Sequence, residues 1–335
     1  MKAVAALFAA LLLAAGCAGS PAAARSPHAL KTVTLVLDWT PNTNHSGIYL
    51  ARAKGWYRQA GLDVKIVEPG EGGSLQPLAA GRADFAVSVA EELLPARAQG
   101  LPVVSIAAIL QHNTSSLMAL TASGIRRPRD LAGRTYGGYG GQLERALVSA
   151  LVRCDGGDPR RVKFVSVGNA DYRAGLTRRF YDFVWVFDGW DKIRMAEIDH
   201  LGVSTIPFAA HTDCIPDWYT PLLATNDRLL RTDPRTVRAF LAATARGYRE
   251  AMGHPDLAAA TLQRAAPELD HRLVGLSAAY LSPRYAADPA RWGRQDLATW
   301  QHFADFLRRS GLLTKPVDVR TAYTDAYLPP VNGGG

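Results

Sequence analysis

Two pairs of acidic and aromatic residues have the chemistry needed to hold a small flat molecule. Asp38 and Trp39 follow a strand predicted over residues 33–37, and Trp190 and Asp191 follow one predicted over 183–187. A carboxylate accepts hydrogen bonds from an amine, and an indole stacks on a flat ring. Ligands of α/β sheets bind in the crevice at the carboxyl ends of strands. The two pairs therefore predict a binding site, with burial in the core as the alternative for each tryptophan.

Further polar residues lie at predicted strand ends, helix starts and loops that face the same crevice. The whole candidate set is Asp38, Trp39, Asn42, His45, Ser74, Ser88, Glu91, Asn113, Tyr136, Gly138, Asp188, Trp190 and Asp191. For Asp38 the alternative is a turn or helix cap, and for His45 it is a loop residue that hydrogen-bonds across the crevice or caps a helix. We predict no catalytic residues and no metal site, because neither a Ser/His/Asp nor a Cys/His pattern accompanies these residues.

The elements that position the first pair can be predicted from the hydrophobic pattern. Apolar residues alternate along 33–37, a polar loop covers 40–45, and Ser46 has the residue type of a helix N-cap. A helical apolar face continues to Trp56, Gly61 is placed to end the helix, and a strand is expected over 63–67.

Strands and helices alternate along the rest of the chain, which predicts parallel, doubly wound sheets. We expect strands at 84–88, 103–110, 163–167 and 183–187, and helices at 75–80, 91–99 and 143–153. Ser74 is predicted to cap the helix at 75–80. A glycine-rich loop ends at Gly141, and such a loop presents free N–H groups to a polar or anionic ligand group. Residues 233–313 are predicted to be mostly helical, with Trp292 and Trp300 in the core.

The N-terminal residues resemble a bacterial lipoprotein signal. Lys2 precedes an uncharged run of alanine and leucine, and small residues come directly before Cys17. We expect a signal peptide over 1–16, lipid attachment at Cys17 and a flexible tether over 17–31. The alternative is an ordinary secretory signal that contains a cysteine by chance.

Composition excludes some function classes. The chain has 335 residues, is 48% hydrophobic and carries a formal charge of +8. Its arginines are scattered singly or in pairs, without a basic helix or aromatic stripe, so we do not expect nucleic-acid binding. Cys154 and Cys214 fit no metal motif; they are either a disulfide within one lobe or two unrelated buried thiols.

The order of these motifs resembles the type II periplasmic solute-binding proteins of ABC importers. It is similar in particular to the family that binds the thiamine pyrimidine precursors formylaminopyrimidine and hydroxymethylpyrimidine. The segments that carry the resemblance are DWTPNTNHSGIYLA (38–51), KGWYRQAGLDV (54–64), LAAGRADFAVS (78–88), PVVSIAAILQHNTS (102–115), YGGYGG (136–141), VFDGWD (186–191) and DWYTPLLAT (217–225).

The resemblance implies an α/β fold of two doubly wound lobes joined by a two-strand hinge. Lobe one would comprise residues 32–119 and 224–335, and lobe two residues 120–223, with crossovers near 119–120 and 222–224. It further implies a monomeric receptor without a cofactor. Such a receptor would sit outside the cytoplasm, anchored to the membrane through its N-terminal lipid, and would pass its ligand to ABC permease subunits. Related branches carry riboflavin or sulfonates.

Two departures from the family pattern bear on the ligand. The family often has an aromatic residue where Asp188 stands and a glutamate where Asp191 stands. An acid in place of an aromatic implies a thinner stack, or a more polar or cationic ligand.

The rival prediction is an enzyme, because the fungal pyrimidine synthases share this fold and consume one of their own histidines together with pyridoxal phosphate. His45 stands at the matching loop position. Those enzymes also carry a dense cysteine cluster, whereas the segment 211–225 has only Cys214. We therefore predict a binding protein rather than an enzyme.

Overall fold

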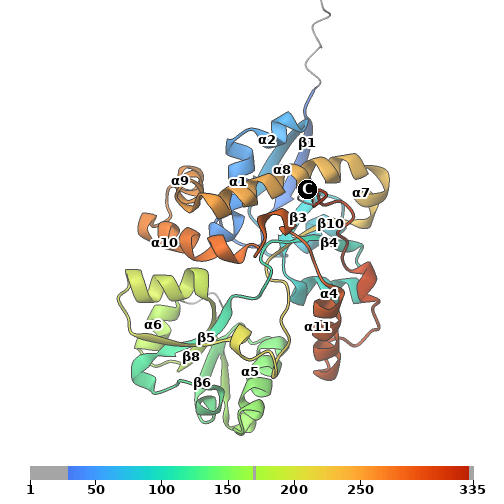
Figure 1. Ribbon diagram of the computed structural model, residues 1–335. Coiled ribbons are helices and arrows are strands. Elements are labelled where there is room, and N and C mark those ends of the chain that lie inside the picture. The colour runs from blue at the N-terminus through green and yellow to red at the C-terminus, as the bar shows by residue number, and fades with distance from the viewer. Residues whose placement is uncertain (1–28, 169–170, 332–335) are drawn as a thin grey trace, which may run out of the picture.

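A computed structural model describes residues 29–168 and 171–331. The chain forms two α/β lobes, with the N- and C-terminal parts together in one lobe and the middle of the sequence in the other (Figure 1). The predicted signal peptide (1–16), Cys17 and most of the predicted tether (17–31) lie outside the described residues. Among the residues that are described, no helix has the length and apolar character needed to cross a membrane.

The first lobe is built on a five-stranded sheet in the order β2-β1-β3-β10-β4. β1 is parallel to β2 and β3, whereas β10 runs antiparallel to both of its neighbours. Its strands are β1 (Lys31–Val36), β2 (Leu62–Val67), β3 (Phe85–Ser88), β4 (Val103–Ala108) and β10 (Leu222–Asn226). Its helices are α1 (Ser46–Ala53), α2 (Trp56–Gln59), α3 (Leu75–Ala79), α4 (Ala90–Ala98), α7 (Asp227–Thr232), α8 (Pro234–Gly253), α9 (Pro255–Ala265), α10 (His271–Leu281) and α11 (Leu297–Arg309).

The second lobe repeats this design in the strand order β7-β6-β8-β5-β9. β6 is parallel to β7 and β8, and β5 is the antiparallel strand. The strands are β5 (Ser115–Leu120), β6 (Thr135–Gly138), β7 (Lys163–Ser166), β8 (Phe183–Phe187) and β9 (Val203–Pro207), and the α-helices are α5 (Gln142–Cys154) and α6 (Tyr172–Thr177). β8 leads into two π-helical turns, η5 (Asp188–Lys192) and η6 (Arg194–Ile198). In each sheet the antiparallel strand is the one that the chain enters after crossing between lobes.

The predicted α/β class is confirmed, because most predicted strands and helices are present and β3 and β4 are buried along their whole length. Trp292 and Trp300 are core residues, as predicted. The sequence reasoning missed β5 and β9 as strands. It also took the sheets as wholly parallel, whereas β10 and β5 are antiparallel. The crossovers differ as well: residues 119–120 lie within β5 and 222–224 within β10, so the chain passes between the lobes at 109–114 and 208–221.

The helix predicted to run on from residue 46 is divided into α1 and α2. Gly55 separates them with a φ of +70°, a left-handed conformation that favours glycine and ends α1. Ser46 is not an N-cap, because it is already helical and its hydroxyl makes no capping bond; Asn42 instead caps the preceding turn, η1 (Thr43–His45), by accepting from Asn44 N. Ser74 does occupy the N-cap position of α3, but its side chain makes no capping bond either.

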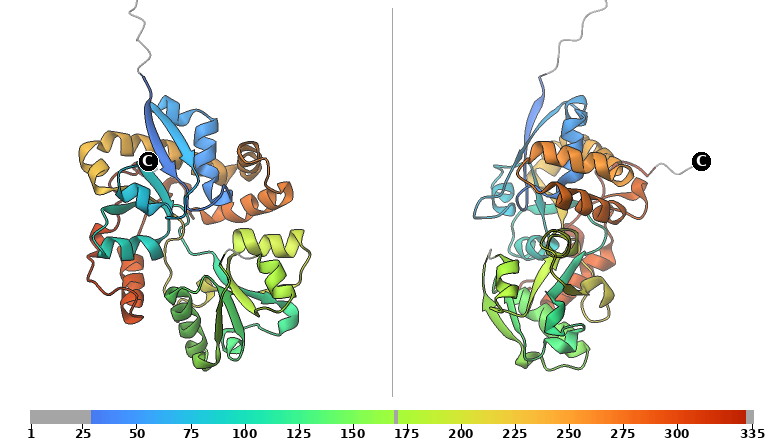
Figure 2. Two further views of the ribbon diagram at one scale, coloured as in Figure 1. Left: turned by 180° about the vertical axis from the view of Figure 1, so that it is seen from behind. Right: turned by 90° about the vertical axis from the view of Figure 1, so that its left-hand side faces the viewer.

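Aromatic side chains join the lobes beside the crossovers. Trp218, in the returning segment, stacks on Phe303 of α11 with ring centroids 5.1 Å apart, and it contacts Trp185 of β8 edge-on at 6.0 Å. The two further views show the chain linking the lobes on one side (Figure 2). This aromatic contact ties the returning segment to both lobes.

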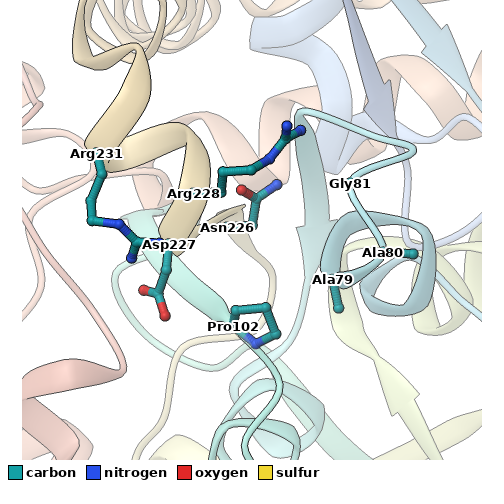
Figure 3. A pocket seen from close by; sticks show the side chains of 8 residues that line it. All are labelled: Ala79, Ala80, Gly81, Pro102, Asn226, Asp227, Arg228 and Arg231. Carbon is teal, nitrogen blue, oxygen red and sulfur yellow. The ribbon is translucent and has the colours of Figure 1, made fainter.

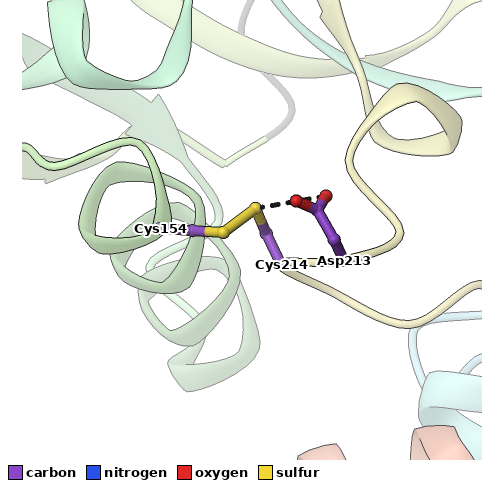
Figure 4. Close-up of side chains that lie close together, drawn as sticks. All are labelled: Cys154, Asp213 and Cys214. Atoms are coloured by element: carbon purple, nitrogen blue, oxygen red, sulfur yellow. Dashed lines mark hydrogen bonds between the residues drawn. A yellow bond between two sulfur atoms is a disulfide. The ribbon is translucent and has the colours of Figure 1, made fainter.

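Cys154, the last residue of α5, forms a disulfide with Cys214 of the returning segment, which resolves the predicted alternatives (Figure 4). Asp213 lies beside the bridge, with its Oδ1 3.5 Å from Cys214 Sγ; a disulfide sulfur has no proton to donate, so this is a contact and not a hydrogen bond. These three side chains bring metal-type donors together. Two sulfurs bonded to each other provide no thiolate, however, so the disulfide accounts for the cluster.

Candidate functional site

The loop after β1 holds a buried histidine in one orientation. His45 is fully buried, and its Nδ1 accepts a hydrogen bond from Asn42 N at 3.2 Å. An accepting Nδ1 places the ring proton on Nε2, which donates to Asp38 Oδ1 at 2.7 Å. Both ring nitrogens are therefore engaged within the protein. His45 positions the Asp38 carboxylate and offers no free nitrogen for chemistry.

Trp39 is not a core residue, which removes the alternative considered for it. Its side chain is 49% exposed at the end of β1, next to the Asp38–His45 pair. No aromatic partner contacts its ring within the part of the chain that is described. A large exposed indole beside a fixed carboxylate is suited to stack on a bound ring.

Glu91 sits where α4 meets the returning crossover. Its Oε2 accepts from Trp218 Nε1 at 2.9 Å, and its Oε1 accepts from Thr220 Oγ1 at 3.4 Å. Burial raises the pKa of Glu91 to about 8, with these two donors opposing the shift. Near neutral pH this side chain is therefore mainly a carboxylic acid, and its O–H is a hydrogen-bond donor.

We predict that the raised pKa of Glu91 makes unfolding depend on pH. From its ordinary value of 4.5 up to about 8, the folded protein keeps a proton that the unfolded chain has lost, so stability should fall as pH rises through this window. Glu91→Gln has no proton to lose, and its amide carbonyl still accepts from Trp218. Its melting temperature without ligand should match the wild type at pH 5 and exceed it by roughly several degrees at pH 8.5.

Thermal unfolding from pH 5 to 9 measures this effect. Glu71→Gln, on an exposed turn, is the control and should follow the wild-type curve. An unchanged pH dependence in Glu91→Gln would show that Glu91 is ionised in the folded protein.

The second acidic group lies on η5 at the end of β8. Asp191 Oδ2 accepts from Phe187 N at 3.1 Å, and burial raises the pKa of Asp191 to about 6. Trp190 does not stand free as Trp39 does. It packs against Tyr49, Leu262 and Val274 of the first lobe. Trp190 therefore forms part of the contact between the two lobes.

The glycine-rich loop after β6 is filled by the protein itself. Glu144 of α5 accepts from Tyr139 N at 3.0 Å and from Gly141 N at 2.8 Å, so these N–H groups are not free for an anionic ligand as the sequence suggested. Tyr136 is buried in the second-lobe core, where its hydroxyl donates to Glu144 at 2.9 Å. Gly138 is required by packing, because a Cβ there would lie 2.4 Å from both Glu144 and the Tyr136 ring.

Tyr139 is a candidate that sequence reasoning missed. Its side chain is 54% exposed, and the raised pKa of its hydroxyl, due mainly to burial, also reflects the nearby Asp191 carboxylate. Tyr172 lies close to both groups. The signal was available in the sequence, because Tyr139 stands between two glycine pairs in a loop, whereas Tyr136 stands in a strand.

Several buried polar atoms at the facing edges of the two sheets have no hydrogen-bond partner in the described residues. They are Ser88 Oγ, Asn113 Nδ2, Ser115 Oγ, Ser116 Oγ and Asp188 Oδ1. Ser88 ends β3, Asn113 lies in the first crossover, and the others begin β5 or follow β8. Burying such atoms without partners costs about 1–3 kcal/mol each. Their gathering at strand ends indicates a place where a ligand supplies the missing bonds.

A hydrogen-bonded relay joins the lobes beside these atoms. The Ser277 hydroxyl of α10 hydrogen-bonds Thr43 of η1 and donates to Gly189 O of η5. Farther out, Arg272 pairs with Glu197 at 3.3 Å. Loop 40–45 of the first lobe and η5 of the second are therefore held near each other, and these are the segments that carry the predicted acid–aromatic pairs.

Two surface cavities lie on the molecule, the larger away from this site and the smaller beside Trp190. The larger, about 580 Å³, is lined by Ala79, Ala80, Gly81, Pro102, Asn226, Asp227, Arg228 and Arg231 (Figure 3). It lies at the opposite end of the first sheet from Asp38, where β4 begins and β10 ends. The smaller, about 230 Å³, lies between Trp190 and η6 of the second lobe and the segment 268–270 with Leu273 of α10 in the first. Of the predicted site residues, Trp190 lines one of these two cavities.

Comparison with known proteins agrees with this architecture. The sequence pattern of the family described as "NMT1/THI5 like" matches residues 42–258. The periplasmic aliphatic sulphonate binding protein SsuA from Escherichia coli superposes with a TM-score of 0.69, at 17% identity, over 87% of this chain and 97% of that one. At this identity the likeness shows the fold alone, and it confirms the predicted type II periplasmic-binding-protein fold.

Curated relatives include both binding proteins and a synthase. The formylaminopyrimidine-binding protein of Halalkalibacterium halodurans is 27% identical over 95% of this chain and 96% of its own. The 4-amino-5-hydroxymethyl-2-methylpyrimidine phosphate synthase of Legionella pneumophila is 26% identical over 89% and 92%. The riboflavin-binding protein RibY of Chloroflexus aurantiacus is 28% identical over 93% and 91%.

Proposed function

We propose that this chain, which belongs to the NMT1/THI5-like family, is the extracytoplasmic solute-binding receptor of an ABC importer for a thiamine pyrimidine precursor, formylaminopyrimidine or hydroxymethylpyrimidine. The observation that carries the proposal is the set of buried, unpartnered polar atoms at the facing strand ends, beside the exposed ring of Trp39. The similarity to a formylaminopyrimidine-binding protein, which extends over nearly the whole length of both chains, supports this choice of ligand.

The residues at the site match the chemistry of an aminopyrimidine. Such a ring has a flat face and an edge that carries an amine donor beside ring-nitrogen acceptors. Trp39 stacks on the face, and Asp38, held by His45, accepts from the amine. Asp191 is a second acceptor from the other lobe, and the protonated Glu91 is a donor for a ring nitrogen. Ligand contacts from both lobes favour their closure.

The local geometry favours binding over catalysis. It also favours a ligand with a basic, hydrogen-donating edge over an anionic ligand. His45, the histidine considered above for a single-turnover reaction, has both ring nitrogens hydrogen-bonded inside the protein. A sulfonate is disfavoured, because the loop N–H groups at residues 139 and 141 are already bonded to Glu144 and the neighbouring side chains are acids.

A thermal-shift panel on residues 18–335 tests the ligand. It comprises formylaminopyrimidine, hydroxymethylpyrimidine, thiamine, riboflavin and taurine. A ligand at 100 times its dissociation constant adds about 2.7 kcal/mol of stability, roughly several degrees for a chain of this size. Stabilisation by the pyrimidines supports the proposal. Stabilisation by riboflavin or taurine alone would keep a receptor role and reject the thiamine link.

We further propose that the receptor is a monomer tethered to the membrane by lipid at Cys17. The apolar run and small residues before Cys17 support this anchor. In membrane fractionation the wild type should pellet with membranes, and Cys17→Ser should lose most of that association. A variant that pellets as the wild type does would exclude lipid at Cys17 as the anchor.

A further inference from the structure

Asp188 is a buried carboxylate that makes no direct ion pair with any described residue. Its side chain is 6% exposed, and Oδ1 has no hydrogen-bond partner among the described residues. Burial raises the pKa of Asp188, while Lys192, the Ser116 hydroxyl and Arg284 oppose the rise without forming an ion pair. A buried carboxylate left in this state is costly, because its charge is neither paired nor fully hydrogen-bonded.

The arginine that acts on Asp188, Arg284, makes its direct contacts elsewhere. The Arg284 guanidinium lies over the Tyr280 ring, 3.7 Å from its centroid, and donates to Tyr280 O at 2.5 Å. Glu197, farther along the π-helical segment, pairs with Arg272, so the ion pair between the lobes in this region does not involve Asp188. Lys192 and Arg284 are near enough to lower the pKa of Asp188, but within the described residues Asp188 forms no direct ion pair.

The surroundings of Asp188 are polar and also unsatisfied. Asp188 N donates to Thr114 O at 3.0 Å, which places its side chain beside the start of β5. There Ser115 Oγ and Ser116 Oγ are buried without partners, and so is Asn113 Nδ2. Asp191 adds a second carboxylate, close enough for Asp188 to raise its pKa further. Although the whole chain carries a formal charge of +8, this edge gathers acids and hydroxyl acceptors.

We propose that Asp188 and Ser116, which share one face of the β5–β8 pair, form a subsite for a positively charged ammonium group, so that the preferred ligand is a heterocycle with a basic substituent. The inference rests on the proposed function. It specifies that the ligand carries a positively charged substituent on the side of the ring opposite the amine that Asp38 binds. An ammonium offers three N–H donors, two of which would pair with Asp188 Oδ1 and the Ser116 hydroxyl oxygen, and its charge would supply a counter-charge in contact with Asp188.

The test compares two pyrimidines that differ in one group, 4-amino-2-methylpyrimidine with 5-hydroxymethyl or with 5-aminomethyl. The aminomethyl compound is protonated at neutral pH, and the hydroxymethyl compound is neutral. Calorimetric titration of the wild type at pH 7 should give at least about tenfold tighter binding of the amine. Asp188→Asn keeps the side-chain shape and should remove this preference. Asp213→Asn, an exposed acid beside the disulfide, should retain it.

Each outcome separates this inference from the proposed function. An amine that fails to bind the wild type, or binds no tighter than the alcohol, would overturn the subsite without recourse to a variant. A preference that persists in Asp188→Asn would assign it to another acid. If the alcohol binds and the amine does not, the pyrimidine receptor stands and the cation subsite is rejected. If neither binds while riboflavin stabilises the protein, the proposed ligand fails as well.

Discussion

Replacing Trp39 with alanine should weaken pyrimidine binding by more than about 100-fold while the melting temperature of the free protein changes by about 1 °C or less. The Trp39 ring is half exposed at the end of β1 and has no aromatic partner in the described chain, so its removal leaves no cavity in the core. A ligand stacked on the ring would cover roughly 100 Å² of apolar surface, worth about 2.5 kcal/mol, and the stack adds about 0.5–1.5 kcal/mol. Each 1.4 kcal/mol is about tenfold in affinity.

Calorimetric titration and thermal unfolding of the same preparations measure both parts. Phe180→Ala is the matched control, since Phe180 is an aromatic residue of the second lobe with 65% of its surface exposed. Its removal should change neither affinity nor stability appreciably. If Trp39→Ala binds as tightly as Phe180→Ala, the ring stacks elsewhere, and Tyr139 is the next candidate. A fall of many degrees without ligand would show instead that Trp39 supports the fold.

The sequence predicted best those elements whose signal is local. The five apolar residues 183–187 were predicted as a strand and form β8 with the same bounds. β5 was missed because it begins with Ser115 and Ser116 and pairs only with residues 60 or more positions away, which no local pattern reveals. The division between α1 and α2 at Gly55 was also missed, because the apolar face continues through it.

For the site, residue type and position at a strand end or helix start select the acids as candidates but do not assign their states. Asp38, Glu91 and Asp191 were all chosen as candidates, yet only the structure shows that His45 fixes the first and that burial raises the pKa of the other two. The choice of Tyr136 over Tyr139 misplaced the exposed ring. In a strand with both faces covered, Tyr136 is buried, and the loop after it carries the exposed side chain.

The position of the Asp38–His45 loop depends on a close approach of two helices. α1 and α8 meet at glycines: a Cβ added to Gly247 would lie 1.9 Å from Gly47 O. The next residue, Tyr248, stacks on Trp292 at 4.4 Å and donates its hydroxyl to Asn44 O at 2.7 Å. The backbone of α8 therefore sets where residues 44–47 lie.

Gly247→Ala should destabilise the protein by about 3 kcal/mol, a fall in melting temperature of roughly 6 °C or more. Glycine-to-alanine changes within helices ordinarily stabilise a protein by up to about 1 kcal/mol, because alanine has the higher helix propensity. The destabilisation expected here is therefore opposite in sign to the effect of helix propensity. The added methyl group must push α1 away from α8, and this moves Asn44 and His45 with it. Pyrimidine affinity should fall too, because Asp38 loses its fixed partner.

Gly253→Ala separates this steric effect from a general effect of alanine in α8. Gly253 ends the same helix, and a Cβ there would meet nothing within 4 Å, so this variant should unfold within about 1 °C of the wild type. Thermal unfolding of the two variants side by side measures the difference. Equal stability would mean that α1 shifts at little cost. If affinity is then also retained, the contact between α1 and α8 does not position the binding loop, and the hydrogen bonds within residues 38–45 hold Asp38 in place on their own.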